Sequence, residues 1–284
     1  PLFYFVNTRA ETMESRNFRH KKSLGQNFLV DRNILKFIVE RASPGAQDVI
    51  LEIGPGKGVL TREILAASCT LLYSVEIDRG LEPFLSDIEA LHSRRFRLIW
   101  GDAMETAYSS FSPPPEKVIA NIPYNITTPL IWRLLEELPS VRYYLLMVQK
   151  EAAERITAPS GTKSRYPLGI TLELMGKASA VRNVPREVFR PVPGVDSCLL
   201  EILLSGEHSK LPVDSLWRGM LRSGFSQRRK KLLKNLRGFH PALPWQDFFE
   251  QAGIGENSRA EELSALQWLE LRRCAEGKKG LFPV

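Results

Sequence analysis

The 284-residue sequence predicts an α/β fold whose mostly parallel sheet carries helices on both faces, followed by a small all-helical domain. Three observations predict this fold. Apolar runs of strand length alternate with amphipathic helical patterns as far as residue 148;. Two later apolar runs, joined by the proline-rich loop PREVFRPVPGVDS, favour an antiparallel hairpin at the edge of the sheet;. Beyond residue 206 only helical patterns remain.

The expected elements follow one another along the chain. A first helix runs from the N-cap residue Asp31 to Arg41, with its apolar residues on one face;. The alternating part is then strand Asp48–Ile53, helix Val59–Ala67, strand Thr70–Ile77, helix 79–88, strand 96–100, strand 117–121, helix 129–138 and strand 142–148. The hairpin strands are Ala178–Val184 and Ser197–Leu204. The last helices are Val213–Gly224, Gln227–Leu236, Trp245–Ala252 and Arg259–Cys274.

Composition excludes several classes of protein. With 43% hydrophobic and 25% charged residues, the chain is close to an average soluble domain and is not a disordered, collagen-like or disulfide-stapled protein;. It has no apolar run of about 18 residues and no signal-peptide pattern at its start;. The three cysteines, Cys69, Cys198 and Cys274, lack metal-ligand or disulfide spacing and favour free thiols;. We therefore expect a cytoplasmic protein without a metal site.

The net charge of +7 is concentrated in two segments. Residues 218–237 carry +8 and residues 1–22 carry +3, so the rest of the chain carries −4. One such cluster is as often a solvated helix face as a binding surface. Two clusters at opposite ends of the chain favour a polyanion partner, RNA or DNA. The residues predicted to contact it are Arg19, Lys21, Lys22, Arg222, Arg228, Arg229, Lys230, Lys231 and Lys234.

A glycine turn, Gly54-Pro-Gly56-Lys-Gly58, joins the first strand of the alternating part to a helix. Such a turn brings main-chain N–H groups and a helix N-terminus close to a cofactor. Glu76, at the end of the next strand, is placed to accept hydrogen bonds from ribose hydroxyls;. These features fit NAD or S-adenosylmethionine, and Lys57 or Arg62 would also suit a phosphate. The G-x-G-x-G spacing, and Asp102 placed to accept from an adenine amine, favour S-adenosylmethionine.

The tetrapeptide Asn121-Ile122-Pro123-Tyr124 follows the strand at 117–121. The Asn121 side-chain oxygen and the Ile122 carbonyl can accept the hydrogens of an adenine amine and localise its lone pair toward a methyl group. Pro123 fixes the loop, and the ring of Tyr124 can stack on the base. In isolation this tetrapeptide is an ordinary turn. At the end of a strand in this sheet it predicts methyl transfer to adenine.

With these motifs, the chain resembles the rRNA adenine N6,N6-dimethyltransferases, specifically the small-subunit (KsgA) branch. The resemblance runs from Lys21 to about Leu271 and comprises KKSLGQNFLVD, EIGPGKGVLT, VEID, GDA, NIPYNITTPL, MVQKEAAER, VFRPVPGVDS and GFSQRRKKLLKNL. It implies a class I methyltransferase fold with S-adenosylmethionine as donor. It also implies dimethylation of two adjacent adenosines near the 3′ end of small-subunit (16S) rRNA. The partner would be the 30S subunit or its precursor, and the enzyme would be a monomer.

The resemblance also assigns residues. The expected cofactor contacts are Gln26, Asn27, Leu29, Gly54, Gly56, Glu76, Ile77, Asp102, Ala103 and Asn121. Phe189 is the expected second stacking ring, with the target base between it and Tyr124. One departure is visible, because Pro167 stands where the family usually has glycine.

The charge distribution and the change to helical patterns after residue 206 divide the chain into regions. Residues 1–22 would be a basic extension, 23–205 the catalytic domain and 206–284 a helical RNA-binding domain. The alternatives are a large-subunit rRNA dimethyltransferase that confers antibiotic resistance and a mainly non-catalytic ribosome-assembly factor. A DNA adenine methyltransferase is disfavoured, because those enzymes usually have an acidic residue in place of Asn121.

Overall fold

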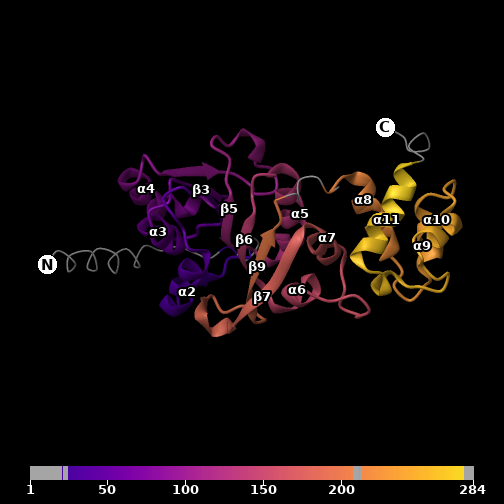
Figure 1. Ribbon diagram of the computed structural model, residues 1–284. Coiled ribbons are helices and arrows are strands. Elements are labelled where there is room, and N and C mark those ends of the chain that lie inside the picture. Colours follow the sequence, from indigo (N-terminus) through magenta and orange to yellow (C-terminus); the bar gives the residue numbers. More distant parts are fainter. Residues whose placement is uncertain (1–20, 22–24, 207–210, 212, 278–284) are drawn as a thin grey trace.

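The computed structural model describes residue 21, residues 25–206, residue 211 and residues 213–277. These residues form a sheet-containing lobe and a smaller helical lobe (Figure 1). The sheet has seven strands in the order β4-β3-β2-β5-β6-β9-β7. They are β2 (Val49–Ile53), β3 (Leu71–Glu76), β4 (Phe96–Trp100), β5 (Lys117–Asn121), β6 (Tyr143–Gln149), β7 (Gly176–Val184) and β9 (Ser197–Leu204). Strands β2 to β6 are parallel, and β9 runs antiparallel to its neighbours β6 and β7. The predicted α/β class and edge hairpin are confirmed.

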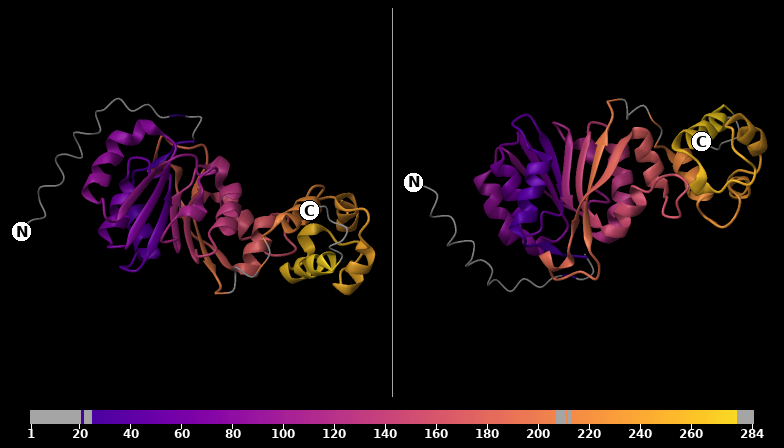
Figure 2. Two further views of the ribbon diagram at one scale, coloured as in Figure 1. Left: turned by 90° about the horizontal axis from the view of Figure 1, so that it is seen from above. Right: turned by 60° about the horizontal axis from the view of Figure 1, so that its bottom comes forward.

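Helices cover both faces of the sheet, as the views in Figure 2 show. One face carries α2 (Arg32–Ala42), α3 (Val59–Ala66) and α4 (Glu82–Leu91), and the other carries α5 (Thr127–Glu137), α6 (Lys150–Ile156) and α7 (Pro167–Met175). Successive side chains of a strand point to opposite faces. Accordingly Ile50 of β2 packs against the first set of helices, while Leu51 packs against the second. Strand β2 is buried along its whole length, as expected for a central parallel strand;.

Local sequence accounts for how these helices begin. The carboxylate of Asp31 accepts from the main-chain N–H groups of Asn33 at 2.8 Å and Ile34 at 3.0 Å, which caps α2 as predicted;. Pro167, the departure from the family pattern, is the first residue of α7. A proline is well tolerated there, because the first N–H of a helix has no partner within the helix.

The helical lobe contains α8 (Ser215–Gly224), α9 (Leu232–Phe239), α10 (Trp245–Gln251) and α11 (Ala265–Glu276). Its core includes the fully buried indoles of Trp217 and Trp268. Helix α7 of the sheet lobe joins this core through Ile170, and the Trp217 indole N–H donates to the Thr171 hydroxyl at 2.8 Å. Helix α7 is therefore packed on both sides, against the sheet and against the helical lobe.

Several features of the fold differ from the sequence prediction. Helix α9 begins at Leu232 and not at Gln227, because the Leu232 N–H donates to the Ser258 carbonyl at 2.8 Å instead of to a preceding turn of helix. The basic run 228–231 consequently lies in the turn between α8 and α9. The final predicted helix is divided into a short 3₁₀ turn, Ala260–Glu262, and α11. Helices α6 and α7 were not predicted.

Two other expectations concern membranes and cysteines. Within the described ranges, no helix combines the length and the apolar character needed to span a membrane. All three cysteines are free thiols; Cys69 and Cys198 are buried and Cys274 is half-buried.

Candidate active site

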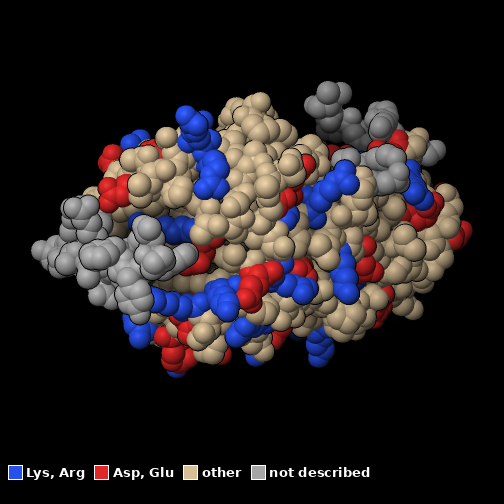
Figure 3. Space-filling model, turned by 60° about the vertical axis from the view of Figure 1, so that its left-hand side comes forward, with Lys and Arg blue, Asp and Glu red and all other residues tan. Residues whose placement is uncertain are grey.

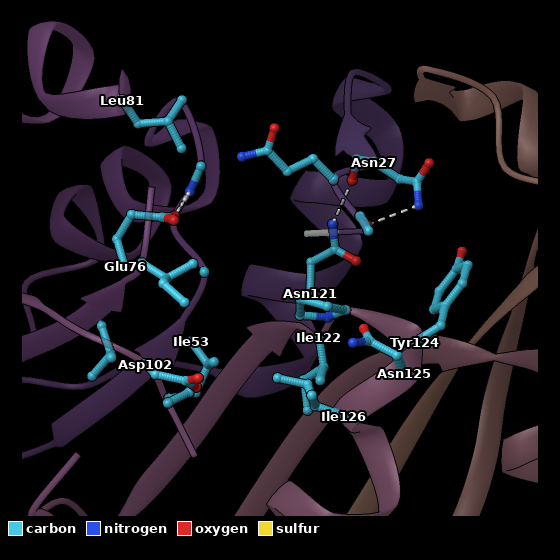
Figure 4. A pocket seen from close by; sticks show the side chains of 18 of the residues that line it. Asn27, Ile53, Glu76, Leu81, Asp102, Asn121, Ile122, Tyr124, Asn125 and Ile126 are labelled. Atoms are coloured by element: carbon cyan, nitrogen blue, oxygen red, sulfur yellow. Dashed lines mark hydrogen bonds between the residues drawn. The ribbon is translucent and has the colours of Figure 1, made fainter. Parts of the chain in front are cut away.

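A pocket opens at the carboxyl-terminal ends of β2, β3 and β5, where ligands bind in open α/β sheets;. In Figure 4, Glu76 and Asp102 lie on one side of this pocket, and Asn27, Asn121 and Tyr124 lie on the other. Of the residues predicted to bind cofactor or target base, those lining the pocket are Gln26, Asn27, Gly54, Gly56, Glu76, Ile77, Asp102, Ala103, Asn121, Ile122, Pro123 and Tyr124.

The glycine turn forms the floor of the pocket on the Glu76 side. Gly54 and Gly56 have φ angles of 67° and 59°, in the left-handed region that favours glycine;. A Cβ atom on Gly56 would lie 2.7 Å from the ring of Phe28, which covers the turn. The main-chain N–H of Gly56 donates to Glu76 at 3.2 Å, so the turn and the end of β3 are joined directly.

The Glu76 side chain is 5% exposed at the end of β3. Its other carboxylate oxygen accepts from the main-chain N–H of Asp78 at 2.8 Å. Burial raises the pKa of Glu76, while the N–H groups of Asp78 and Gly56 partly offset that rise. Each carboxylate oxygen keeps a further lone pair, so the group can still accept from a ligand hydroxyl.

Asp102 lies after β4, beside Glu76 at the same edge of the sheet. One of its carboxylate oxygens accepts from the Met104 main-chain N–H at 2.7 Å, which holds the side chain in place. The other oxygen can accept from an amine in the pocket. Arg62, by contrast, does not line the pocket, since its guanidinium donates to the carbonyls of Lys57, Gly58 and Phe84. Lys57 does not line the pocket either, and its ammonium lies over the rings of Phe28 and Phe84. The phosphate alternative therefore loses both of its cations.

Asn121 is the last residue of β5 and lies on the far side of the pocket from Glu76. Its side-chain amide nitrogen donates to the main-chain carbonyl of Asn27 at 3.0 Å. This bond orients the amide and leaves its oxygen available as an acceptor. The N–H of the next residue, Ile122, donates to the Met147 carbonyl of the neighbouring strand β6 at 3.2 Å, which fixes the start of the loop.

Tyr124 begins a 3₁₀ turn, Tyr124–Ile126, that leads into α5. Its ring flanks the pocket beside Asn121 (Figure 4). The phenol oxygen lies 2.6 Å from the hydroxyl oxygen of Ser197, the first residue of β9. Burial raises the pKa of Tyr124, so the phenol is neutral at physiological pH.

Two predicted site residues lie elsewhere. Leu29 and Phe189 do not line the pocket and belong to the buried core beside α2 and α3. They pair with each other across two short antiparallel strands, β1 (Phe28–Leu29) and β8 (Phe189–Arg190). The Phe189 side chain is fully buried because it fills this core, so stacking on a base would require the ring to leave it.

Gln26 lines the pocket but is already engaged by protein groups. Its amide nitrogen donates to Asp78 at 2.7 Å, and its oxygen accepts from the main-chain N–H of Lys21 at 2.9 Å. The Lys21 ammonium lies 2.6 Å from the fully buried carboxylate of Asp78. Burial alone would raise the pKa of Asp78, but the hydrogen bonds from Lys21 and Gln26 outweigh it and lower that pKa. Lys21 therefore anchors the pocket rim.

The remaining basic residues divide into three groups. Arg19 and Lys22 lie outside the described residues. The exposed ones are Arg222, Arg229, Lys230, Lys231 and Lys234. Arg228 is half-buried, donates to the Arg165 carbonyl at 2.8 Å and lies over the ring of Phe225. On the face shown in Figure 3, basic side chains alternate with acidic ones in a band and do not form one continuous surface.

The pocket also contains residues that the sequence did not assign. Phe28 and Asn125 lie next to predicted site residues in the motifs GQNFL and NIPYN. Their position within these motifs is the sequence signal that could have predicted them. Ile53 and Leu81 are apolar residues that sequence cannot separate from the core. In the part of the chain that the structure describes, no cluster of three His, Cys, Asp or Glu side chains could hold a metal ion.

Comparison with known proteins identifies the family. A family model described as ribosomal RNA adenine dimethylase matches residues 17–276. The protein "Ribosomal RNA small subunit methyltransferase A" of Clostridium botulinum is 35% identical over 273 residues, covering 95% of this chain and 98% of its own. The protein of the same name from Bacillus mycoides is 36% identical over 277 residues, covering 93% and 94%.

Two solved structures agree with this result. A dimethyladenosine transferase from Plasmodium falciparum has a TM-score of 0.75 and 28% identity, covering 89% of this chain and 98% of its own. The 23S rRNA methyltransferase ErmE has a TM-score of 0.63 and 26% identity, covering 88% and 100%. The sheet order, the pocket at the strand ends and the match over residues 17–276 lead to one conclusion: the chain belongs to the ribosomal RNA adenine dimethylase family.

Proposed function

We propose that this protein transfers methyl groups from S-adenosylmethionine to the N6 amines of two adjacent adenosines near the 3′ end of small-subunit (16S) rRNA, during biogenesis of the small subunit. The observation that carries the proposal is the Asn121 amide, which donates to Asn27 at 3.0 Å and presents its oxygen as an acceptor. An acceptor at this strand end suits an amine nucleophile. The names of the relatives, which match 93–95% of this chain, support the small subunit as substrate.

The pocket residues fit the methyl donor. At Gly54 the nearest atom to an added Cβ is the Asn121 carbonyl oxygen at 3.8 Å, so the turn leaves open space there, and Glu76 can accept from the ribose hydroxyls. The free carboxylate oxygen of Asp102 can accept from the adenine amine of the donor. When bound, the donor supplies an electrophilic methyl group on a sulfonium centre. The protein residues then have to hold the nucleophile in line with that group, which is chiefly a positioning effect.

The residues on the other side of the pocket would hold the target adenine. Its amine is a poor nucleophile, because the nitrogen lone pair is delocalised into the ring. The Asn121 oxygen and the Ile122 carbonyl would accept the two amine hydrogens and draw the nitrogen toward a pyramidal geometry. The Tyr124 ring would stack on the base, a contact worth about 1–3 kcal/mol. Once the nitrogen has gained the methyl group it is acidic, so its proton can leave to water without a strong protein base.

The exposed basic side chains of the helical lobe would bind the rRNA of the ribosomal subunit. Arg222, Arg229 and Lys230 are exposed and can neutralise phosphates;. We expect the partner to be the 30S subunit or its precursor and the enzyme to act as a monomer. The free cysteines fit a reducing compartment, and we place the reaction in the cytoplasm;.

The test is methylation in vitro with labelled S-adenosylmethionine. We expect label in unmethylated small subunits, recovered as dimethyladenosine at two adjacent positions when the digested rRNA is mapped by mass spectrometry. Label in large-subunit rRNA would contradict the assignment and favour the antibiotic-resistance alternative. Binding of Asn121→Ala to small subunits without label separates catalysis from docking. If the wild-type protein also binds without label, the assembly-factor alternative is correct.

A further inference from the structure

The Tyr124–Ser197 hydrogen bond joins a loop of the pocket to a rigid part of the sheet. Ser197 is fully buried and is the first residue of β9. Its main chain pairs with Gln149 of β6 on one side and with Val184 of β7 on the other. Tyr124 lies in a single 3₁₀ turn, where the main chain is held by fewer bonds. The 2.6 Å contact therefore ties a side chain of the pocket loop to a strand that is paired on both sides.

The hydrogen bond to Ser197 holds the far end of the Tyr124 ring. Tyr124 is half-buried and flanks the pocket, so one side of the ring faces the space that the target base would occupy. The two torsions of the side chain leave the ring free to swing unless its far end is held. The buried hydroxyl of Ser197 restrains the ring through its hydrogen bond to the phenol. Ser197 belongs to strand β9 and is 73 residues away in the sequence.

We propose that Ser197 is a positioning residue that holds the Tyr124 ring against the target base, and that this pair chiefly supports the second of the two methyl transfers to each adenosine. The proposal rests on the proposed function, because it concerns the same pocket and the same base. It adds a residue that touches neither the base nor the methyl donor, and it assigns that residue to one step.

The reason lies in the hydrogen count of the amine. An unmodified adenine amine has two N–H groups, one for the Asn121 oxygen and one for the Ile122 carbonyl. In the first transfer the nitrogen forms a bond to the methyl carbon as the carbon–sulfur bond breaks with its electron pair going to sulfur. One proton then leaves the nitrogen to water. The monomethylated amine that remains has a single N–H group, so one acceptor no longer has a partner.

The second transfer forms and breaks the same kinds of bonds and again releases one proton to water. It differs in that the base is now held by one hydrogen bond fewer. Loss of one net hydrogen bond corresponds to about fivefold in a rate or binding constant. With both amine hydrogens bound, two hydrogen bonds orient the base even when the Tyr124 ring moves. After the first methylation one hydrogen bond remains, so stacking on Tyr124, which does not depend on the amine hydrogens, becomes the second restraint on the orientation of the base. Loss of the Ser197 hydrogen bond should therefore slow the second transfer more than the first.

The experiment compares Ser197→Ala, Tyr124→Phe and the double variant on unmethylated small subunits. Quench-flow sampling and mass spectrometry give the rate constants of the first and second transfers separately. Ser140→Ala is the matched control, because it also removes a single hydroxyl hydrogen bond, to the Pro115 carbonyl at 2.7 Å, from residues outside the pocket. The melting temperature of each variant is measured in parallel without donor or RNA.

We expect Ser197→Ala to lower the ratio of the second rate constant to the first by about fivefold, and Tyr124→Phe to lower it by a similar factor. The double variant should match either single variant, because both remove the same contact. Ser140→Ala should leave the ratio unchanged. If Ser197→Ala is too unstable to assay, Tyr124→Phe breaks the same hydrogen bond from the other side and still decides the outcome.

Three results would overturn the proposal. Equal slowing of both transfers would assign the pair to general binding of the base. Additive effects in the double variant would show that Ser197 does not act through Tyr124. Two unchanged rate constants would show that the contact contributes to neither transfer. Failure of the proposed function gives a different result, namely no methylation of small subunits by the wild-type protein.

Discussion

The side-chain amide of Asn121 donates to the main-chain carbonyl of Asn27 at 3.0 Å, across 94 residues of sequence. Asn27 is a predicted cofactor contact, and Asn121, on the same side of the pocket, is the residue proposed to hold the target amine. The bond therefore links a predicted contact of the methyl donor to the proposed acceptor of the target amine. It also determines which end of the amide is free, since the nitrogen is occupied and the oxygen is not.

This relationship predicts that two different substitutions at Asn121 are equally damaging. Asn121→Asp keeps an oxygen acceptor of the same size but replaces the donor with an anion facing the Asn27 carbonyl. We expect the aspartate to be displaced and kcat to fall about 100-fold or more, as it does when a preorganised polar group is lost. Asn121→Ala should be equally impaired. Methyl incorporation into small subunits measures the effect, and near-normal activity of the aspartate variant would refute the donor role.

The second prediction concerns Gly56. Gly56→Ala places a Cβ at a φ of 59° and 2.7 Å from the ring of Phe28. We expect a loss of about 1–3 kcal/mol of stability, together with weaker donor binding as Phe28 is displaced from the turn. Thermal unfolding and calorimetric titration measure the two effects. Gly194→Ala is the control, because that glycine has neither a positive φ nor a neighbour within 4 Å of an added Cβ.

A pH dependence follows from Glu52 of β2. Its carboxylate is buried and accepts from Thr61 at 2.8 Å and Ser74 at 2.7 Å, yet burial raises its pKa from 4.5 to about 7. The folded state thus binds more protons than the unfolded state between pH 4.5 and 7. The stability tied to Glu52 is therefore fully present below pH 4.5 and is lost as the pH rises to about 7, by up to about 3 kcal/mol.

Glu52→Gln tests this dependence, because glutamine keeps an oxygen acceptor for Thr61 and Ser74 and does not ionise. We expect the free energy of unfolding of the variant to decline less than that of the wild type between pH 5 and pH 7.5. Denaturant titrations at both pH values measure the difference. Parallel pH profiles of the two proteins would show that Glu52 does not titrate in this range.

The fourth prediction separates two neighbours in the basic turn. Arg229 is exposed, so Arg229→Gln should lower the slope of log affinity for rRNA against log salt by about one;. Arg228 donates to the Arg165 carbonyl, so Arg228→Gln should instead lower the melting temperature. Filter binding at several salt concentrations and thermal unfolding measure the two quantities. Equal changes in salt slope would show that both arginines contact phosphate.

Much of the fold could be predicted from sequence because its signals are local. Strand β9 was predicted at its observed bounds, and α2 to within one residue, because an apolar run or an N-cap marks each one. Helix α7 was not predicted, since its apolar residues are spread around the helix and show little helical period. The start of α9 was misplaced because the bond from Leu232 to Ser258 is a tertiary contact.

In the site, too, features set by local sequence could be predicted, and features set by tertiary contacts could not. Residues adjoining a strand end, such as Glu76 and Asn121, were placed in the pocket by topology alone. Phe189 was assigned by motif, and its burial in the core depends on the pairing of β8 with β1, which no local pattern indicates. The partner of Tyr124 was not predicted either, because Ser197 reaches it only once β9 inserts beside β6.

Because α7 packs against both the sheet and the helical lobe, the two lobes cannot be separated without exposing apolar surface. A fragment that ended at residue 205 would expose Ile170 and leave the Thr171 hydroxyl without the Trp217 indole. This surface would be an exposed apolar patch on the sheet-containing lobe, and it would promote aggregation. A recombinant catalytic fragment would therefore need polar substitutions there to remain soluble. A chimaera that carries a different helical lobe would likewise have to bury Ile170. The junction between the two parts would therefore have to be designed around α7.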